Sequence, residues 1–283
     1  LEGKGKIDIW GAITVTLGFG ALVYGFTLAE EGWARVDTIG FIAAGVLLVI
    51  VFGVIETRVS HPLLPLRVIF HKVRAGAYIV QAMIGAVLIG STMYLTFHLQ
   101  LVLGMAPLAA GLATVVMTAS TLAVVPVFTK LLPVWGARVM MIAGPVVGAL
   151  GMFYMSGVTA DGNYFVQVLP GLVLVGAGVG ITFVPLQNLA LVGVQPSDAG
   201  AAAATVNVAM QLGGSIGLSV FALAAASASR AVAATQSHVS DAEVMAAGYG
   251  AVFFTAGVAL TIAAVAAFVL VRGTKEQLLP SRG

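Results

Sequence analysis

The sequence predicts an all-α membrane protein, a polytopic membrane helix bundle of about eight transmembrane helices. Of its 283 residues, 60% are hydrophobic and only 8% are charged, and the mean hydropathy is +1.07. The apolar residues form eight continuous runs. A run of roughly 20 residues is long enough to cross a hydrocarbon core about 30 Å thick. Polarity does not alternate along the runs, which favours helices over a membrane barrel.

Charged or turn-forming segments separate these runs, and each run is interpreted as one span. The first run follows Lys4 and Lys6 and ends at Glu30 and Glu31 rather than at a small-residue cleavage site, so it is a span and not a signal peptide. Later spans are bounded by the basic segments 56–74 and 130–138, the turn 104–107, and the polar segments 159–164 and 227–247. The expected spans, in order, are 9–29, 36–55, 76–103, 108–131, 139–158, 165–187, 201–226 and 248–271.

The orientation follows from the distribution of Lys and Arg, which gather in cytoplasmic connections. One set of connections holds only Arg35 and Arg230. The opposite set holds Lys4, Lys6, Arg58, Arg67, Lys72, Arg74, Lys130, Arg138, Arg272, Lys275 and Arg282. We therefore expect a multi-pass protein of the cell membrane with both termini of this chain in the cytoplasm. The net charge of +2 is explained by this distribution of Lys and Arg between the two sides of the membrane. The basic residues form no contiguous basic face, so nucleic acid is not an expected partner.

The connection 56–74 is the strongest internal boundary because it combines Pro62 and Pro65 with clustered cations. Proline disfavours a continuous helix, and the leucines beside it would let the segment lie against the membrane surface. We interpret it as a solvated linker with lipid contacts, with a regulatory site as the alternative. The expected units are a two-helix linker hairpin (1–57), a cytoplasmic connection (58–75), a six-helix C-terminal bundle (76–273) and a cytoplasmic tail (274–283).

Several motifs carry a resemblance to a known family. They are HPLLPLRVIF at 61–70, YLTFHLQLVLGMAPLAAGL from Tyr94, Asp198-Ala-Gly200, and Asn207 followed by Gln211-Leu-Gly213-Gly214 and Gly217. In order and spacing the chain resembles the C-terminal part of a 14-span drug:proton antiporter of the major facilitator superfamily. In such proteins two extra helices lie between two six-helix bundles, so the resemblance implies a two-plus-six division here.

The resemblance also implies parts that this chain lacks. Six further helices would precede Leu1, forming an N-terminal bundle that carries the carboxylates usually assigned to proton coupling. The chain is therefore expected to be a fragment of a longer transporter. Met210 stands where the family often has a basic residue, and Ala203 where Ser is common. Both departures suit an apolar or amphipathic small-molecule substrate.

Polar side chains inside the spans are candidates for the wall of a substrate cavity, because an amide in hydrocarbon turns towards a partner or a water-filled space. Interhelical hydrogen bonding is the alternative at each position. His98, near the outer end of its span, could relay protons, but a solvated or hydrogen-bonded imidazole is the simpler interpretation. The cavity candidates are Gln81, Tyr94, His98, Gln100, Gln187, Asn188, Asn207 and Gln211.

Glycine pairs four residues apart, Gly176 with Gly180 and Gly213 with Gly217, predict helix-packing seams, with sliding surfaces for alternating access as the alternative. The cytoplasmic loop KLLPVWGAR, with Lys130, Gly136 and Arg138, resembles a degenerate form of the family's loop motif. It lacks that motif's acidic residue, so a basic anchor at the membrane surface is favoured over a gating role.

Enzyme chemistry is not expected. The chain has no cysteine, no paired intramembrane carboxylate and no HExxH, GxSxG or P-loop motif, so neither a metal site nor a cofactor is predicted. A membrane enzyme would have to use Arg230, His238, Asp241 and Glu243 in the 227–247 loop. The expected function is the C-terminal portion of a secondary active transporter that exports drugs or other amphipathic small molecules by proton antiport and alternating access. The alternative is a non-transporting membrane partner subunit or an inactive fragment.

Overall fold

The computed structural model describes residues 9–29, 32–58, 71–194, 198–235 and 238–272. Most of the predicted connection 58–75 and all of the tail 274–283 lie outside the described residues. The elements in order are α1 (Ile9–Leu28), α2 (Val36–Glu56), α4 (Lys72–Gly85), η1 (Ala86–Ser91), α5 (Thr92–Phe97), η2 (His98–Val102), α6 (Pro107–Trp135), α7 (Ala137–Met155), η3 (Tyr164–Val168), α8 (Leu169–Ala190), α9 (Ala199–Thr235) and α10 (Asp241–Leu270).

The predicted fold class is confirmed. Within the described residues, eight helices are long and apolar enough to cross a membrane. One of them, Lys72–Val102, runs from α4 through the π-helical segments η1 and η2, and another, Tyr164–Ala190, joins the π-helical η3 to α8.

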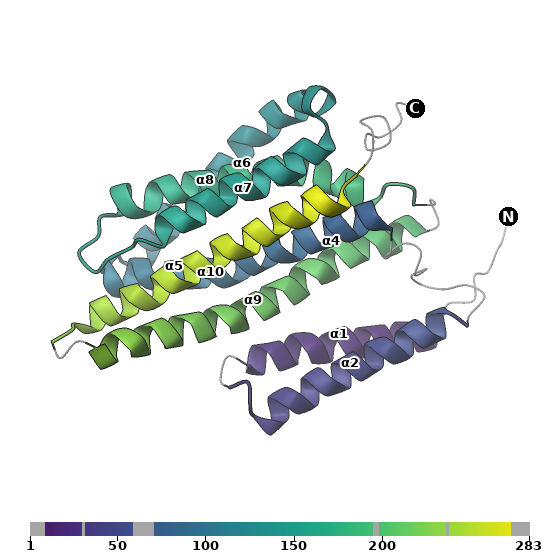
Figure 1. Ribbon diagram of the computed structural model, residues 1–283, viewed down its shortest axis with the longest axis horizontal. Helices are drawn as coiled ribbons and strands as arrows, with labels where there is room; N and C mark the ends of the chain where they lie inside the picture. Colours follow the sequence, from purple (N-terminus) through teal and green to yellow (C-terminus); the bar gives the residue numbers. More distant parts are fainter. Residues whose placement is uncertain (1–8, 30–31, 59–70, 195–197, 236–237, 273–283) are drawn as a thin grey trace.

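The helices α1 and α2 pack on each other as a hairpin, and α1 contacts α9 (Figure 1). The other six spans pack together, with α10 against α7, α9 and α4, and with α6 held mainly by α8. The apolar window of α6 is only 6% buried, whereas that of Tyr164–Ala190 is 61% buried. The helix α6 therefore lies at one side of the bundle and α8 lies inside it.

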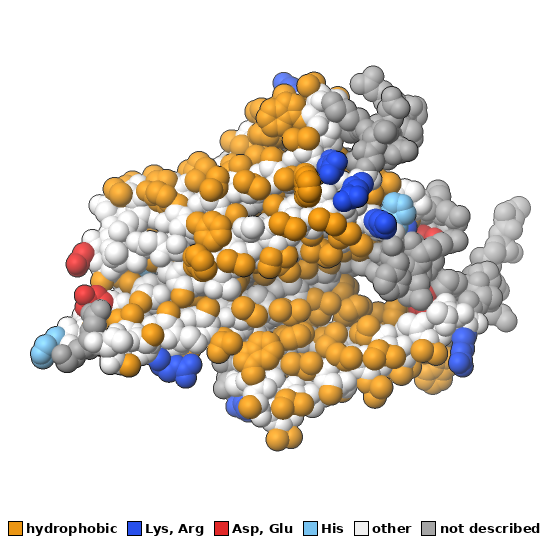
Figure 2. Space-filling model, in the orientation of Figure 1, with side chains coloured by type: hydrophobic (Ala, Val, Ile, Leu, Met, Phe, Trp, Pro, Cys, Tyr) orange, Lys and Arg blue, Asp and Glu red, His pale blue; other side chains and the backbone are white. Residues whose placement is uncertain are grey.

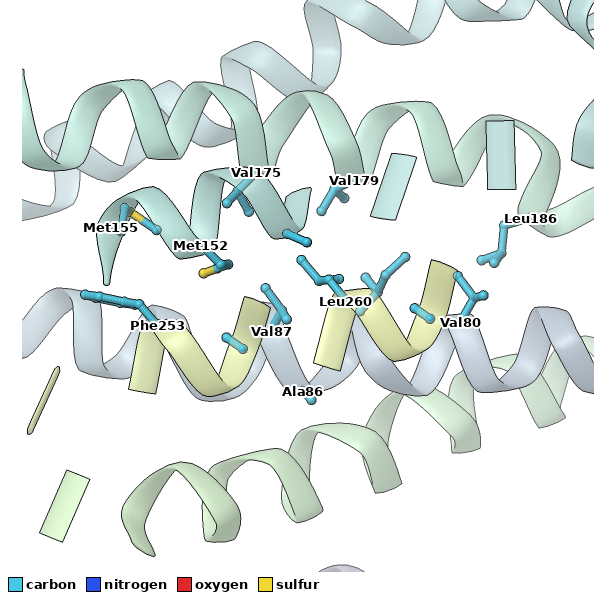
Figure 3. Close-up of a cluster of buried hydrophobic side chains, with 14 of the residues drawn as sticks. Val80, Ala86, Val87, Met152, Met155, Val175, Val179, Leu186, Phe253 and Leu260 are labelled. Atoms are coloured by element: carbon cyan, nitrogen blue, oxygen red, sulfur yellow. The ribbon is translucent and has the colours of Figure 1, made fainter. Parts of the chain in front are cut away.

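A cluster of buried apolar side chains joins α4, η1, α7, α8 and α10 (Figure 3). Its members include Val80, Val87, Met152, Val175, Val179, Phe253 and Leu260. Lipid gives helices no hydrophobic drive to associate, so close contact depends on small residues. The contact between α7 and α8 shows this, because a Cβ added at Gly178 would lie 2.5 Å from the Gly148 nitrogen.

Two predicted connections are wrong because helix continues through them. The helix α9 extends to Thr235 and α10 begins at Asp241, so most of the expected 227–247 loop is helical. An alanine-rich stretch has high helix propensity even where it is less apolar, and the start of α10 is fixed by a capping box. In that box the Ser240 hydroxyl accepts a hydrogen bond from the Glu243 nitrogen, and the Glu243 carboxylate accepts one from the Ser240 nitrogen at 2.8 Å.

The expected loop 130–138 is also mostly helix. The helix α6 continues through Lys130 to Trp135, and Gly136 alone separates it from α7. Gly136 has φ 80° and ψ 156°, a conformation that is essentially restricted to glycine. One residue therefore makes the whole turn between two spans.

Candidate functional site

Glycines bring α4 and α9 into backbone contact. Gly213 packs on Ala82, and Gly217 packs on Ala86, where an added Cβ would lie 2.5 Å from the Ala86 Cβ. Gly85 of α4 in turn faces the backbone of Met210. The predicted pair Gly213 and Gly217 thus lies on the face of α9 that meets α4.

The other predicted pair lies where α8 meets α6. A Cβ at Gly180 would be 2.5 Å from Val124 Cγ2, and Gly176 faces the backbone of Met117. Two hydroxyls of α6 donate across the same contact: Ser120 Oγ to Val173 O at 2.8 Å, and Thr121 Oγ1 to Gly176 O at 2.8 Å. Close backbones and interhelical hydrogen bonds together attach the exposed α6 to the bundle.

Of the cavity candidates, Asn207 and Gln211 come together. Both are exposed on one face of α9 and line a cavity of about 400 Å³ between α9 and α1, whose side includes Phe19, Tyr24 and Thr27. The Asn207 amide donates to Ala203 O of its own helix at 3.4 Å. These two side chains therefore face the hairpin, not the interior of the six-helix bundle.

Gln81 is buried at the α4–α9 contact, and its amide nitrogen donates to Met210 Sδ at 3.2 Å. Among the described residues, its Oε1 has no hydrogen-bond partner. A larger cavity of about 780 Å³ adjoins the first one and lies between α1, α2, α4 and α9. The remaining amides line neither cavity. Gln187 and Asn188 are exposed near the end of α8, and Gln100 is half-buried in η2.

His98 lies in an aromatic cluster. Its ring is completely buried, with its centroid 6.1 Å from that of Tyr249, and Tyr94 lies 6.1 Å from the same tyrosine. Among the described residues, neither nitrogen of His98 has a hydrogen-bond partner. The simpler expectation of a solvated or hydrogen-bonded imidazole is therefore wrong, because the side chain points towards α10 and away from the surface.

Basic residues line one end of the bundle, which we call the basic end and define by Arg58, Lys72, Arg74, Lys130 and Arg138. Arg138 donates to Phe268 O at 3.1 Å and stacks over the Phe268 ring, 5.4 Å from its centroid, so it caps the C-terminal end of α10. Arg74 is buried and donates to Val192 O at 2.5 Å. Lys130 is exposed.

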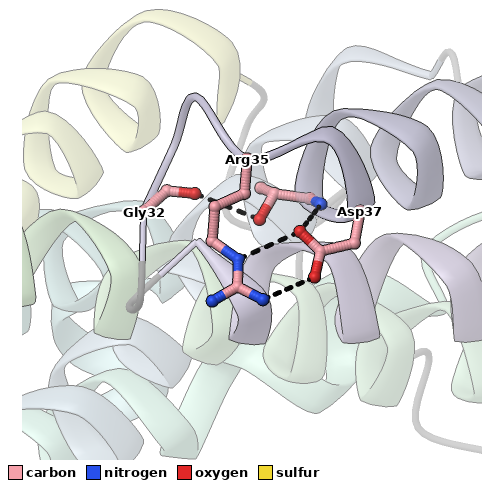
Figure 4. Close-up of polar contacts among 4 residues, drawn as sticks. Gly32, Arg35 and Asp37 are labelled. Carbon is pink, nitrogen blue, oxygen red and sulfur yellow. Dashed lines mark hydrogen bonds and ion pairs between the residues drawn. The ribbon is translucent and has the colours of Figure 1, made fainter.

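The opposite end carries an ion pair at the turn before α2 (Figure 4). Arg35 binds Asp37 through two bonds, Nε to Oδ1 at 3.0 Å and Nη2 to Oδ2 at 2.7 Å. Asp37 Oδ1 also accepts the Thr38 nitrogen at 2.9 Å, and Thr38 Oγ1 donates to Gly32 O at 3.1 Å. The charge of Arg35 is thus neutralised by a neighbouring residue.

Three features were missed from the sequence. Tyr78 lines the larger cavity beside α1, Ser219 of α9 donates to Phe26 O of α1, and Arg74 reaches the turn that follows α8. Arg74 and Tyr78 are four residues apart, so the helical period could have placed them on one face of α4. Nothing in the sequence pairs α9 with α1.

Within the part of the chain that the structure describes, eight long apolar helices packed through glycines define the chain as a polytopic membrane protein. Residues 9–218 match the sequence model of the Major Facilitator Superfamily, and the chain belongs to this family.

Its relatives include antibiotic resistance and export proteins. The chain is 32% identical to the puromycin resistance protein pur8 of Streptomyces alboniger, over 96% of this chain and 55% of the relative. It is 34% identical to the cephamycin export protein CmcT of Amycolatopsis lactamdurans, over 86% of this chain and 51% of the relative. The tetracenomycin C resistance and export protein of Streptomyces glaucescens is 28% identical over 78% of this chain. The chain spans about half the length of these curated relatives.

Proposed function

We propose that this chain is the C-terminal portion of a secondary active transporter that exports antibiotics or other amphipathic small molecules in exchange for protons. The observation that carries the proposal is the alignment of 96% of the chain with a puromycin resistance protein. Alternating access by rocking of two bundles is the mechanism that suits such a fold. The small-residue contacts of α4 with α9 and of α6 with α8 would keep the six-helix bundle of this chain rigid while it moves.

In this proposal the six-helix bundle of this chain forms one wall of the transport path, and a preceding six-helix bundle forms the other. The hairpin of α1 and α2 is the linker between the two bundles. The protein spans the cell membrane, and its basic end faces the cytoplasm. The central parts of the spans here contain no Asp or Glu, so proton coupling would depend on carboxylates of the preceding bundle. Of the cavity candidates, Asn207 and Gln211, which line the cavity between α9 and α1, are the ones placed to contact substrate.

The test is drug accumulation in a bacterial host deleted for its own efflux pumps. Expression of the full-length gene product should lower steady-state puromycin accumulation several-fold, and an uncoupler that collapses the proton gradient should restore it. The 283-residue chain expressed alone should leave accumulation unchanged. Unchanged accumulation with the full-length product would overturn the proposal and favour a non-transporting partner subunit.

A further inference from the structure

The span Lys72–Val102 is π-helical in two places, at η1 and at η2, and the short α5 lies between them. A π-helical turn holds an extra residue compared with an α-helical turn, and such segments are frequent at functional sites. When a π-helical segment moves along a helix, the residues that it passes turn about the helix axis by about 100°. The helix on either side stays in place. A span with a π-helical segment can therefore rotate one part of itself.

The bundle holds the two π-helical segments unequally. Gly90 of η1 packs on α9, where an added Cβ would lie 2.6 Å from the Phe221 ring. The segment η2 is the last helical piece before the turn at Gly104, and its Leu101 is 58% exposed. The segment η2 is therefore the one with room to move towards α5.

His98 begins η2, and burial leaves its imidazole without compensation. The ring is completely buried, and neither nitrogen has a hydrogen-bond partner among the described residues, which disfavours this conformation. The far side of the same segment is polar, because it carries the half-buried Thr92, Thr96 and Gln100. If η2 moves into α5, His98 takes the angular position that the half-buried Phe97 has now, next to this polar side.

The surroundings of His98 hold no charge that would bind an imidazolium in place. The elements that pack against η2 are α5, α6 and α10. Their titratable groups within the described residues are Tyr94, Lys130, Asp241, Glu243 and Tyr249. Tyr249 contacts the imidazole ring, and Tyr94 contacts Tyr249, each with ring centroids 6.1 Å apart. Glu243 is held by the capping box, Asp241 lies in the first turn of α10, and Lys130 is at the basic end.

The position of His98 along its span decides which water it can reach. The cluster of blue side chains in Figure 2 marks the basic end, and the span begins there with Lys72. His98 lies in the last part of that span, so it is near the opposite end. The aqueous phase nearest to His98 is the one on the side away from the basic residues.

We propose that residues 92–98 rotate about the axis of their helix and carry the His98 imidazole from its buried position beside Tyr249 to water, where the ring takes up one proton. The proton comes from the aqueous phase opposite the basic end, and the product is a hydrated imidazolium. An imidazole in water titrates at about pH 6.5, so protonation at about pH 5 shifts the equilibrium towards the exposed position by about 30-fold. This proton site is additional to the carboxylates expected in the preceding bundle, and the proposal does not depend on transport.

The test is solid-state NMR of the full-length protein in lipid bilayers with ¹⁵N-labelled histidine, because the nitrogen shifts distinguish a neutral imidazole from an imidazolium. Comparison with His98→Gln identifies the His98 signals, and the exposed His238 in the same sample is the reference. We expect His98 to be neutral at about pH 8 and protonated at about pH 5. A His98 ring that stays neutral at both values would overturn the proposal.

A deletion and a substitution at one position test the role of the π-helical segment. Deletion of Leu101 removes the extra residue of η2, so His98 should remain neutral at about pH 5. Leu101→Ala keeps the number of residues and should leave protonation unchanged. Thermal unfolding of both variants checks that they are folded. Protonation of His98 in a folded deletion variant would show that no rotation of this kind is needed, contrary to the proposal.

Amide hydrogen exchange at about pH 5 distinguishes rotation from unfolding. A rotation within one span leaves the neighbouring helix intact, so the amides of α10 around Tyr249 should remain protected while His98 is protonated. Loss of protection in α10 would mean that the bundle itself opens, and this result would also overturn the proposal.

Discussion

His98 and Tyr249 meet edge to face inside the bundle, with ring centroids 6.1 Å apart and ring planes at 87°. The contact joins the π-helical η2 to α10, and it buries the imidazole completely. Since no described residue bonds to either ring nitrogen, His98 contributes packing at the expense of two unsatisfied polar atoms.

Replacement of this imidazole by a side chain of similar size should stabilise the protein. We expect His98→Leu to raise the free energy of unfolding by about 1 kcal/mol, because it removes unpaired polar atoms from an apolar site. His98→Ala should lower it by about 2–4 kcal/mol because it leaves a cavity. Thermal unfolding in detergent measures both changes. Destabilisation by His98→Leu would mean that the ring has a polar partner in solution.

The α4–α9 contact should not tolerate a methyl group. Gly213→Ala is expected to cost about 1–3 kcal/mol of stability, because the new Cβ would collide with the backbone of Ala82. Gly111→Ala is the control, since nothing lies within 4 Å of its Cβ position on α6. Comparison of the two melting temperatures tests the contact, and equal values would show that α4 and α9 are not this close.

The hydroxyl bond between α6 and α8 should contribute about 0.6–1.7 kcal/mol, the range of interhelical hydrogen bonds in membranes. Thr121→Val removes the bond to Gly176 O, whereas Thr129→Val removes only a bond to Val125 O within α6. Denaturant unfolding of the two variants gives the difference. Identical midpoints would contradict the interhelical bond.

Gly136 should resist substitution for a conformational reason. Gly136→Ala places a Cβ at φ 80° and is expected to cost about 1–3 kcal/mol. Gly53→Ala, in α2 with nothing within 4 Å of the added atom, should be neutral or slightly stabilising. Thermal unfolding of the two variants measures the difference. If the turn at Gly136 were flexible, the two variants would have equal melting temperatures.

The proposed orientation can be tested with single cysteines, because the chain has none of its own. In intact cells, Ser227→Cys near the end of α9 should react with a membrane-impermeant maleimide. Lys130→Cys at the basic end should react only after lysis. The reverse pattern would invert the topology inferred from the Lys and Arg distribution.

The number and class of the helices follow from the sequence, because the thickness of the bilayer and the need to pair backbone groups within each span act locally. The ends of α9 and α10 do not follow in the same way. Hydropathy marks where the apolar run stops, at about 226, whereas the helix continues to Thr235 through alanine-rich turns. Membrane burial and helix propensity are separate properties, and hydropathy predicts only the first of them.

The spacing of the glycines likewise predicts that Gly176 lies on the same helix face as Gly180, and Gly213 on the same face as Gly217. It does not predict which helix each pair contacts. In the structure the first pair contacts α6 and the second contacts α4. The burial of His98 and the cavity beside Tyr78 depend in the same way on which faces oppose each other. The length of an apolar run and the charge of a connection are properties of single segments, so the sequence alone predicts them. Partner choice arises from the simultaneous fit of side chains from distant segments, so only the tertiary structure decided it.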